Sequence, residues 1–145
     1  MKNIIDRNVV RKNSFKEELK TTTSKINPPI FSWLEFSLSG LCNRVCEFCP
    51  RSNPIDFPNL NKHMSVEVYT RVIKDLSNVN YQGGFIYSGF SEPILYKYLF
   101  EVIKVTRKFL PNNRIELITN GDHLKIDQLL KLFEYGLTQI SVSLY

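Results

Sequence analysis

All three cysteines of the chain, Cys42, Cys46 and Cys49, fall within one short stretch with the spacing C-x3-C-x2-C. Scattered cysteines would be read as small core side chains, but three thiolates on one loop can hold a soft metal ion or an iron–sulfur cluster. An odd number of cysteines fits disulfide pairing poorly and fits a reduced, cytoplasmic metal site well. A zinc site would need a fourth ligand, for which His63, His123 or a carboxylate are the options.

Length and composition indicate one globular domain with a real hydrophobic core. The chain has 145 residues, of which 43% are hydrophobic and 23% charged, values that are ordinary for a soluble protein. No apolar run approaches the roughly 20 residues that a membrane span needs. The N-terminus has no apolar segment of the kind found in secretory signals. We therefore expect a cytoplasmic protein without a membrane partner.

The net charge of +5 is concentrated at the N-terminus. Residues 1–30 hold seven Lys/Arg and three Asp/Glu, and the remainder of the chain is close to neutral. A near-neutral domain lacks the basic face of a dedicated nucleic-acid binder, so the charge pattern argues against such a function. We interpret residues 1–30 as a solvated basic leader with at most one short helix near Ser14–Lys20. It ends in a linker over Thr21–Pro29, and residues 31–145 form the folded domain.

Hydrophobic patterns after the leader alternate between strand and helix periodicity. Helices are predicted after an N-cap at Ser65, from Leu95 to Phe109, and from Ile126 to a left-handed cap at Gly136. Strands are predicted at Phe31–Leu38, Phe85–Tyr87, Arg114–Thr119 and Gln139–Tyr145. The order β-α-β-α-β-α-β implies right-handed crossovers, and therefore an α/β fold with a parallel sheet.

Three chemically unusual loops follow the predicted strands. The cysteine loop follows the first strand, Ser88–Pro93 the second and Thr119–Asp122 the third. Ligands of parallel sheets bind beyond the carboxyl ends of the strands, so these loops share the edge where a site is expected.

The cysteine spacing, with the aromatic Phe48 just before Cys49, resembles the signature of the radical S-adenosylmethionine (radical SAM) superfamily. The resemblance covers residues 31–145 and continues in order along the strands. It implies a partial (βα) barrel and a [4Fe–4S] cluster whose fourth iron is chelated by S-adenosylmethionine. In that family, one electron from the cluster cleaves the cofactor to a 5′-deoxyadenosyl radical, which abstracts hydrogen from a substrate.

The stretch Ser88–Leu95 resembles the Gly-Gly-Glu-Pro motif of the family. By this resemblance, Glu92 and the backbone of Phe90 and Ser91 hydrogen-bond the ammonium group of S-adenosylmethionine. The sequence departs from the motif because Phe90 and Ser91 replace the two glycines.

Three further residues take cofactor roles by the same resemblance. Asn120 belongs to a Thr-Asn-Gly turn that lies near cofactor and substrate in the family. Ser143 stands where the fourth strand offers a polar contact to the cofactor, and Phe48 would pack near its adenine. Read without the resemblance, Glu92 is a loop acid, Asn120-Gly121 a common turn pair and Ser143 a polar filler.

The resemblance also predicts partners and an incomplete domain. The chain supplies fewer βα units than the family's barrel and is truncated after its fourth strand, so we expect the N-terminal portion of a radical SAM domain with little or no activity alone. A small-molecule or peptide substrate and an electron donor such as a flavodoxin or ferredoxin are implied. The Cys-Pro-Arg run at Cys49–Arg51 favours branches with a C-terminal auxiliary-cluster (SPASM-like) domain. The alternative is a non-catalytic iron–sulfur or zinc-binding module.

Overall fold

The computed structural model describes residues 7–23 and 31–144, and within the first of these ranges the side chains of residues 9–17. The described strands form one parallel sheet in the order β1-β2-β3-β4. Their bounds are Trp33–Phe36 for β1, Gly84–Tyr87 for β2, Ile115–Thr119 for β3 and Gln139–Val142 for β4. The predicted α/β fold with a parallel sheet is confirmed.

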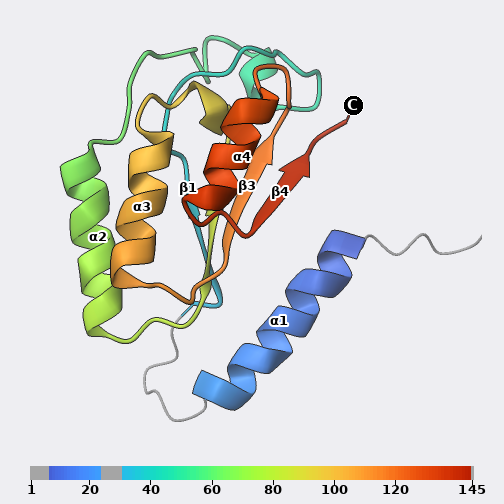
Figure 1. The fold of residues 1–145 in the computed structure, drawn as a ribbon. Coiled ribbons are helices and arrows are strands. Elements are labelled where there is room, and N and C mark those ends of the chain that lie inside the picture. The colour runs from blue at the N-terminus through green and yellow to red at the C-terminus, as the bar shows by residue number, and fades with distance from the viewer. Residues whose placement is uncertain (1–6, 24–30, 145) are drawn as a thin grey trace, which may run out of the picture.

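Three helices connect successive strands and pack on one face of the sheet (Figure 1). They are α2 (Val66–Asn78), α3 (Leu99–Phe109) and α4 (Ile126–Glu134). Two short 3-10 turns, η1 (Pro50–Ser52) and η2 (Pro93–Leu95), lie in the loops after β1 and β2. Because η2 occupies the start of the second predicted helix, α3 begins at Leu99 and not at Leu95.

The core lies between the sheet and these three helices. Its fully buried members include Phe85 and Leu117 from the sheet and Ile103 from α3. Polar groups enter this core only with partners: the hydroxyl of Tyr69 lies 2.6 Å from that of Tyr87 and 2.6 Å from Thr106 Oγ1. Burial raises the pKa of Tyr87 to about 12 and that of Tyr69 well above its usual value.

The ends of two helices form as the sequence predicts. Ser65 caps α2, since its hydroxyl accepts a hydrogen bond from Val68 N at 3.2 Å. Gly136 follows α4 with φ +111° and donates to Phe133 O, while Leu137 N donates to Leu132 O. This pair of bonds is a Schellman cap, which requires a left-handed residue where glycine stands.

The N-terminal helix differs from its prediction. A short helix near Ser14–Lys20 was expected in a solvated leader, but α1 spans Arg7–Thr23 and contacts the sheet. Phe15 is only 6% exposed and packs edge-on against Trp33, with ring centroids 5.0 Å apart. Figure 1 shows α1 apart from the other helices, near the start of β4. The linker expected after it falls partly in α1 and otherwise outside the described residues.

A partly buried ion pair joins α1 to the sheet. Arg11 Nη2 lies 3.0 Å from Glu116 Oε2, and Glu116, in β3, is almost fully buried. Ser141 donates a second hydrogen bond to Glu116 Oε1.

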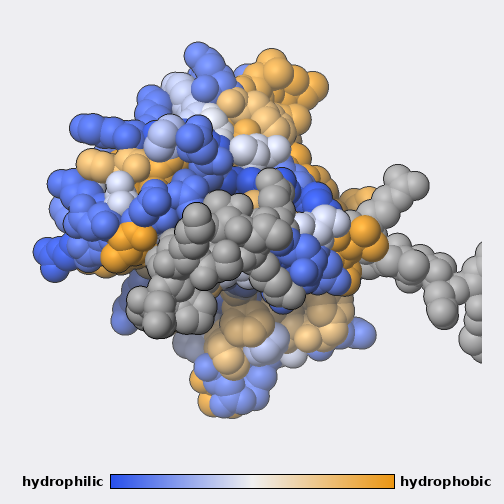
Figure 2. Space-filling model, turned by 90° about the horizontal axis from the view of Figure 1, so that it is seen from below, coloured by the Kyte–Doolittle hydropathy of each residue, from blue (hydrophilic) through white to orange (hydrophobic). Residues whose placement is uncertain are grey.

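Seen from below, hydrophilic residues cover much of the visible face, and hydrophobic ones lie in separate patches between them (Figure 2). Within residues 7–23 and 31–144, no helix has the length and apolar character needed to cross a bilayer.

Candidate cluster and cofactor site

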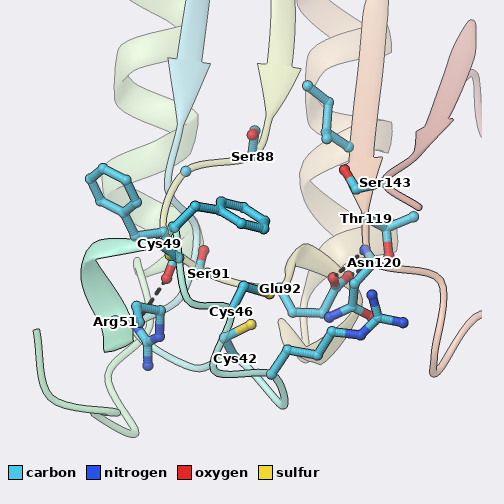
Figure 3. A pocket seen from close by; sticks show the side chains of 15 residues that line it. Cys42, Cys46, Cys49, Arg51, Ser88, Ser91, Glu92, Thr119, Asn120 and Ser143 are labelled. Atoms are coloured by element: carbon cyan, nitrogen blue, oxygen red, sulfur yellow. Dashed lines mark hydrogen bonds between the residues drawn. The ribbon is translucent and has the colours of Figure 1, made fainter. Parts of the chain in front are cut away.

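One open pocket lies at the carboxyl edge of the sheet, where the loops after all four strands meet (Figure 3). All nine residues predicted for the site line it: Cys42, Cys46, Phe48, Cys49, Phe90, Ser91, Glu92, Asn120 and Ser143. The sheet itself brings them together, because the strands are parallel and each loop leaves the same edge.

Backbone hydrogen bonds fix the loops to one another. Ser143 N donates to Thr119 O at 2.8 Å, which continues the pairing of β3 with β4 up to the pocket. Glu92 N donates to Leu41 O at 2.8 Å and so ties the loop after β2 to the start of the cysteine loop. The pocket wall is therefore one hydrogen-bonded unit, although its parts lie far apart in the sequence.

The cysteine loop carries three free thiols, each partly exposed. Asn59 holds the loop at its first cysteine, since Cys42 N donates to Asn59 Oδ1 at 3.0 Å and Asn59 Nδ2 donates to Cys42 O at 3.1 Å. In the part of the chain that the structure describes, no three His, Cys, Asp or Glu residues are placed to share one metal ion. Cysteines that hold an iron–sulfur cluster bind separate irons, so they need to surround a space and not to converge on a point.

Glu92 is 2% exposed and binds the end of β3 through its carboxylate. Its Oε1 accepts from Thr119 Oγ1 at 2.6 Å and from Ile94 N at 3.0 Å, and its Oε2 accepts from Asn120 N at 2.8 Å. A carboxylate has about four acceptor positions, so one position on Oε2 remains for a further donor. Glu92 thus positions the turn after β3 and can still accept a hydrogen bond from a ligand.

The residues that replace the two motif glycines differ in what they present. The hydroxyl of Ser91 is buried and has no hydrogen-bond partner among the described residues. A buried hydroxyl without a partner is costly, so this atom marks a position that a polar ligand group can satisfy. Phe90 is 51% exposed and packs edge-on against Phe57, with ring centroids 5.3 Å apart.

An arginine inside the cysteine motif joins the loop to the turn after β3. Arg44 donates from Nε and Nη2 to the two carboxylate oxygens of Asp122, at 2.8 and 2.5 Å. Asn43 Nδ2 donates to Asp122 Oδ2 at 2.7 Å and its Oδ1 accepts from Asn120 Nδ2 at 2.9 Å. The hydrogen bond raises the pKa of Arg44 and lowers the pKa of Asp122. These contacts hold the cysteine loop over the end of β3.

Six lining residues were not predicted from the sequence: Arg44, Arg51, Ser88, Gly89, Ile118 and Thr119. Arg44 and Arg51 lie within and just after the cysteine motif, and this proximity is the one signal in the sequence that could have found them. Gly89 has φ +98°, and a Cβ there would lie 1.9 Å from Ser37 Oγ, so it is the glycine that the turn requires. His63 and His123, the ligand options for a zinc site, do not line the pocket.

The family model described as the Radical SAM superfamily matches residues 36–145. Because this match covers most of the chain, the protein belongs to the radical SAM superfamily. The cofactors of this family are a [4Fe–4S] cluster and S-adenosylmethionine. The predicted family and the predicted cofactors are confirmed at this level.

Similar proteins include enzymes that use different substrates. The chain is 29% identical over 114 residues to the S-adenosyl-L-methionine-dependent 2-deoxy-scyllo-inosamine dehydrogenase of Niallia circulans, covering 79% of this chain and 45% of that protein. It is 30% identical over 112 residues to the GTP 3′,8-cyclase of Clostridium perfringens, covering 77% of this chain and 34% of that protein. The crystal structure of BtrN in complex with AdoMet and 2-DOIA matches with a TM-score of 0.73 and 29% identity, covering 79% of this chain and 46% of BtrN.

The matches cover only part of each similar protein. It spans less than half the length of the curated relatives that it matches. The four-stranded partial barrel agrees with the structural match to BtrN, so the predicted fold class is confirmed.

Proposed function

We propose that this chain forms the cluster- and cofactor-binding part of a radical SAM enzyme. The observation that carries the proposal is the pocket itself, in which cysteines, a buried carboxylate and an unpartnered hydroxyl from separate loops face one space. When bound, the [4Fe–4S] cluster of this family supplies the electron that reductively cleaves S-adenosylmethionine. The roles below concern the residues of this chain.

The three thiolates of Cys42, Cys46 and Cys49 would each bind one iron. Asn59 supports this role by holding both backbone polar groups of Cys42, which limits the freedom of the first ligand. The thiols are free and partly exposed, so they are accessible to iron and sulfide during assembly. Three thiolates leave the fourth iron of such a cluster open for S-adenosylmethionine.

Glu92 and Ser91 would bind the amino-acid end of S-adenosylmethionine. The free acceptor position on Glu92 Oε2 and the unsatisfied hydroxyl of Ser91 suit an ammonium group. The carbonyl of Phe90 already accepts a hydrogen bond from Arg51 at 2.9 Å, so its contribution is limited to its second lone pair. This division of roles follows from which acceptors the protein itself already uses.

The remaining predicted residues would hold the rest of the cofactor. Asn120 and Ser143 stand on neighbouring strand ends and offer polar side chains to the pocket. Phe48 is 64% exposed beside the cysteines and suits stacking on an adenine. Phe90, also exposed, would narrow the pocket where the family usually has glycine.

The proposal extends to a small-molecule substrate and an electron donor. Support for the first comes from BtrN, whose crystal structure is described in complex with AdoMet and 2-DOIA. A peptide substrate, a flavodoxin or ferredoxin donor, an auxiliary-cluster domain and a cytoplasmic location stay predictions from the sequence.

Anaerobic reconstitution of the 145-residue chain with iron and sulfide tests the proposal. We expect about four irons and four sulfides per chain, and a change in the EPR signal of the dithionite-reduced cluster when S-adenosylmethionine is added. Val45→Ala is the matched control, since Val45 is exposed and lies beside Cys46 in the same loop.

The same experiment distinguishes the alternatives. A cluster that forms but whose EPR signal does not change when S-adenosylmethionine is added would indicate a non-catalytic iron–sulfur module. Retention of zinc in preference to iron would indicate a zinc-binding module. Either result would overturn the proposed function.

A further inference from the structure

Arg51 is a buried cation in the wall of the cluster pocket. It follows Cys49 and Pro50 and lies in η1, with 8% of its surface exposed. Its Nη1 donates to Phe90 O at 2.9 Å, and its Nη2 donates to Gly40 O at 3.1 Å and to Asn59 Oδ1 at 2.5 Å. One guanidinium therefore ties together the start of the cysteine loop, the segment that holds Cys42, and the loop after β2.

The partners of Arg51 carry no charge. All three acceptors are neutral oxygens, and no carboxylate of the described residues lies within ion-pair distance of the guanidinium. Arg44, the other arginine of the pocket, differs because its charge is matched by Asp122. Burying a cation without a counter-charge is costly unless a negative group is nearby when the protein is in its working state.

The position of Arg51 identifies that negative group. Figure 3 shows Arg51 beside Cys49 and Ser91, across the pocket from Thr119 and Asn120. Three thiolates bring negative charge into the pocket when they bind iron, and reduction of the cluster adds one more electron. Of the two arginines that line the pocket, Arg44 is paired with Asp122, so Arg51 is the one without an acidic partner among the described residues.

We propose that Arg51 acts as the counter-charge of the reduced cluster, and that it positions the Phe90 carbonyl and the Cys42 loop around it. This inference rests on the proposed function, because it requires the three cysteines to hold a cluster. A cation fixed in a wall of low dielectric favours the reduced form over the oxidised form, since the reduced form is more negative. Arg51 is thus a positioning residue with an electrostatic effect, and it makes no contact with the reacting atoms.

Two variants separate the charge from the hydrogen bonds. Arg51→Lys keeps the positive charge but loses the planar fork, whereas Arg51→Gln keeps one amide donor group and loses the charge. A third variant, Asn59→Asp, leaves Arg51 in place and puts a carboxylate where the Asn59 amide oxygen now accepts from it at 2.5 Å. It also removes the Asn59 Nδ2 donor to Cys42 O, so Asn59→Ser, which loses the same donor without adding a charge, is its control. Arg71→Gln serves as the control, because Arg71 is an exposed arginine on α2.

The measurement is an anaerobic redox titration of the reconstituted chain, followed by the EPR signal of the reduced cluster. At a fixed potential, we expect Arg51→Gln and Asn59→Asp to lower the ratio of reduced to oxidised cluster on the order of tenfold, with the midpoint potential shifted to more negative values. Arg51→Lys and Arg71→Gln should stay close to the wild type.

Each outcome bears on a different statement. If the wild type forms no cluster, the proposed function fails and this inference with it. If the wild type is loaded but Arg51→Gln and Asn59→Asp titrate at its potential, the counter-charge role is refuted while the proposed function stands. If Arg51→Gln does not fold or load, Asn59→Asp decides: a potential more negative than that of Asn59→Ser supports the inference, and a potential equal to it contradicts the inference.

Discussion

The helix-covered face of the sheet and its carboxyl edge, where the loops form the pocket (the loop edge), differ in how their polar groups are paired. On the helix-covered face, Ile103, Phe85 and Leu117 are fully buried, and the few polar groups, such as Thr106, satisfy one another. At the loop edge, charged and polar side chains line an open pocket, and Ser91 is buried without a partner among the described residues. The first arrangement pairs its polar groups within the protein, whereas the second leaves groups that a ligand can satisfy.

The difference teaches which residues to assign to function. Polar groups that are buried and fully paired within the helix-covered core are explained by their role in the fold. Polar groups that are buried at the loop edge and incompletely paired are not explained by folding alone. Glu92, with one open acceptor position, is an example. Four predictions use this contrast.

The largest effect is expected for a cysteine of the loop edge. Cys46→Ala removes one of the three proposed ligands from a partly exposed loop, so we expect near-complete loss of the cluster with the fold unchanged. Iron and sulfide analysis after anaerobic reconstitution measures the loss, and far-UV circular dichroism with a thermal melt checks the fold. A variant that keeps full cluster content would refute the assignment of Cys46 as a ligand.

The helix-covered face should respond in the opposite way. Ile103→Ala leaves a cavity between α3 and the sheet, and we expect it to lower the free energy of unfolding by about 2 to 5 kcal/mol. Val68→Ala, on the exposed side of α2, should cost less than about 0.5 kcal/mol. Urea denaturation of the apo chain measures both. Equal stability of the two variants would mean that the core does not lie where the structure has it.

A residue that belongs to both regions should show both effects. Glu92→Gln turns one acceptor oxygen into a donor amide facing Thr119 or Asn120, so we expect a loss of about 1 to 3 kcal/mol of stability. It also removes the charge proposed to bind an ammonium group, so affinity for S-adenosylmethionine should fall at least about tenfold. Denaturation and equilibrium binding measure these separately. Unchanged affinity for S-adenosylmethionine in a folded, loaded variant would refute the proposed role of Glu92 in binding the cofactor.

Alkaline pH should weaken the helix-covered face selectively. Burial raises the pKa of Tyr87 to about 12, so the tyrosine ionises less readily in the folded state than in the unfolded state. The contribution of neutral Tyr87 to the free energy of unfolding is complete below pH 10. About 2 kcal/mol of this free energy is lost as the pH rises towards 12. Tyr87→Phe should show a shallower loss of stability over this range in thermal melts. An identical pH dependence in both proteins would contradict the assignment.

Much of the fold could be predicted because local signals agreed with the tertiary structure. Strand and helix periodicity, the cap at Ser65 and the left-handed Gly136 all appear where the sequence indicates. The extent of α1 could not be predicted, since it depends on packing of Phe15 on Trp33 and on the pairing of Arg11 with Glu116, a hundred residues away.

The difference between local signals and contacts of distant segments also separates the predicted site residues from the missed ones. The cysteines stand out by their spacing, and Glu92 stands out by the family motif that Ser88–Leu95 resembles. Arg51 is as close to the cysteines in the sequence, but its burial follows from Asn59 and Phe90, which only the folded chain brings to it. A sequence pattern identifies which residues can do chemistry, but it does not indicate which charged side chain the fold will bury.

The most direct test of the account is the EPR spectrum of the reduced, reconstituted chain before and after addition of S-adenosylmethionine. If the loop edge holds a cluster with an iron open to the cofactor, the g-values should change on addition, and the change should be reduced in Glu92→Gln. A spectrum that is the same with and without the cofactor, in a chain that carries a full cluster, would contradict the proposed site.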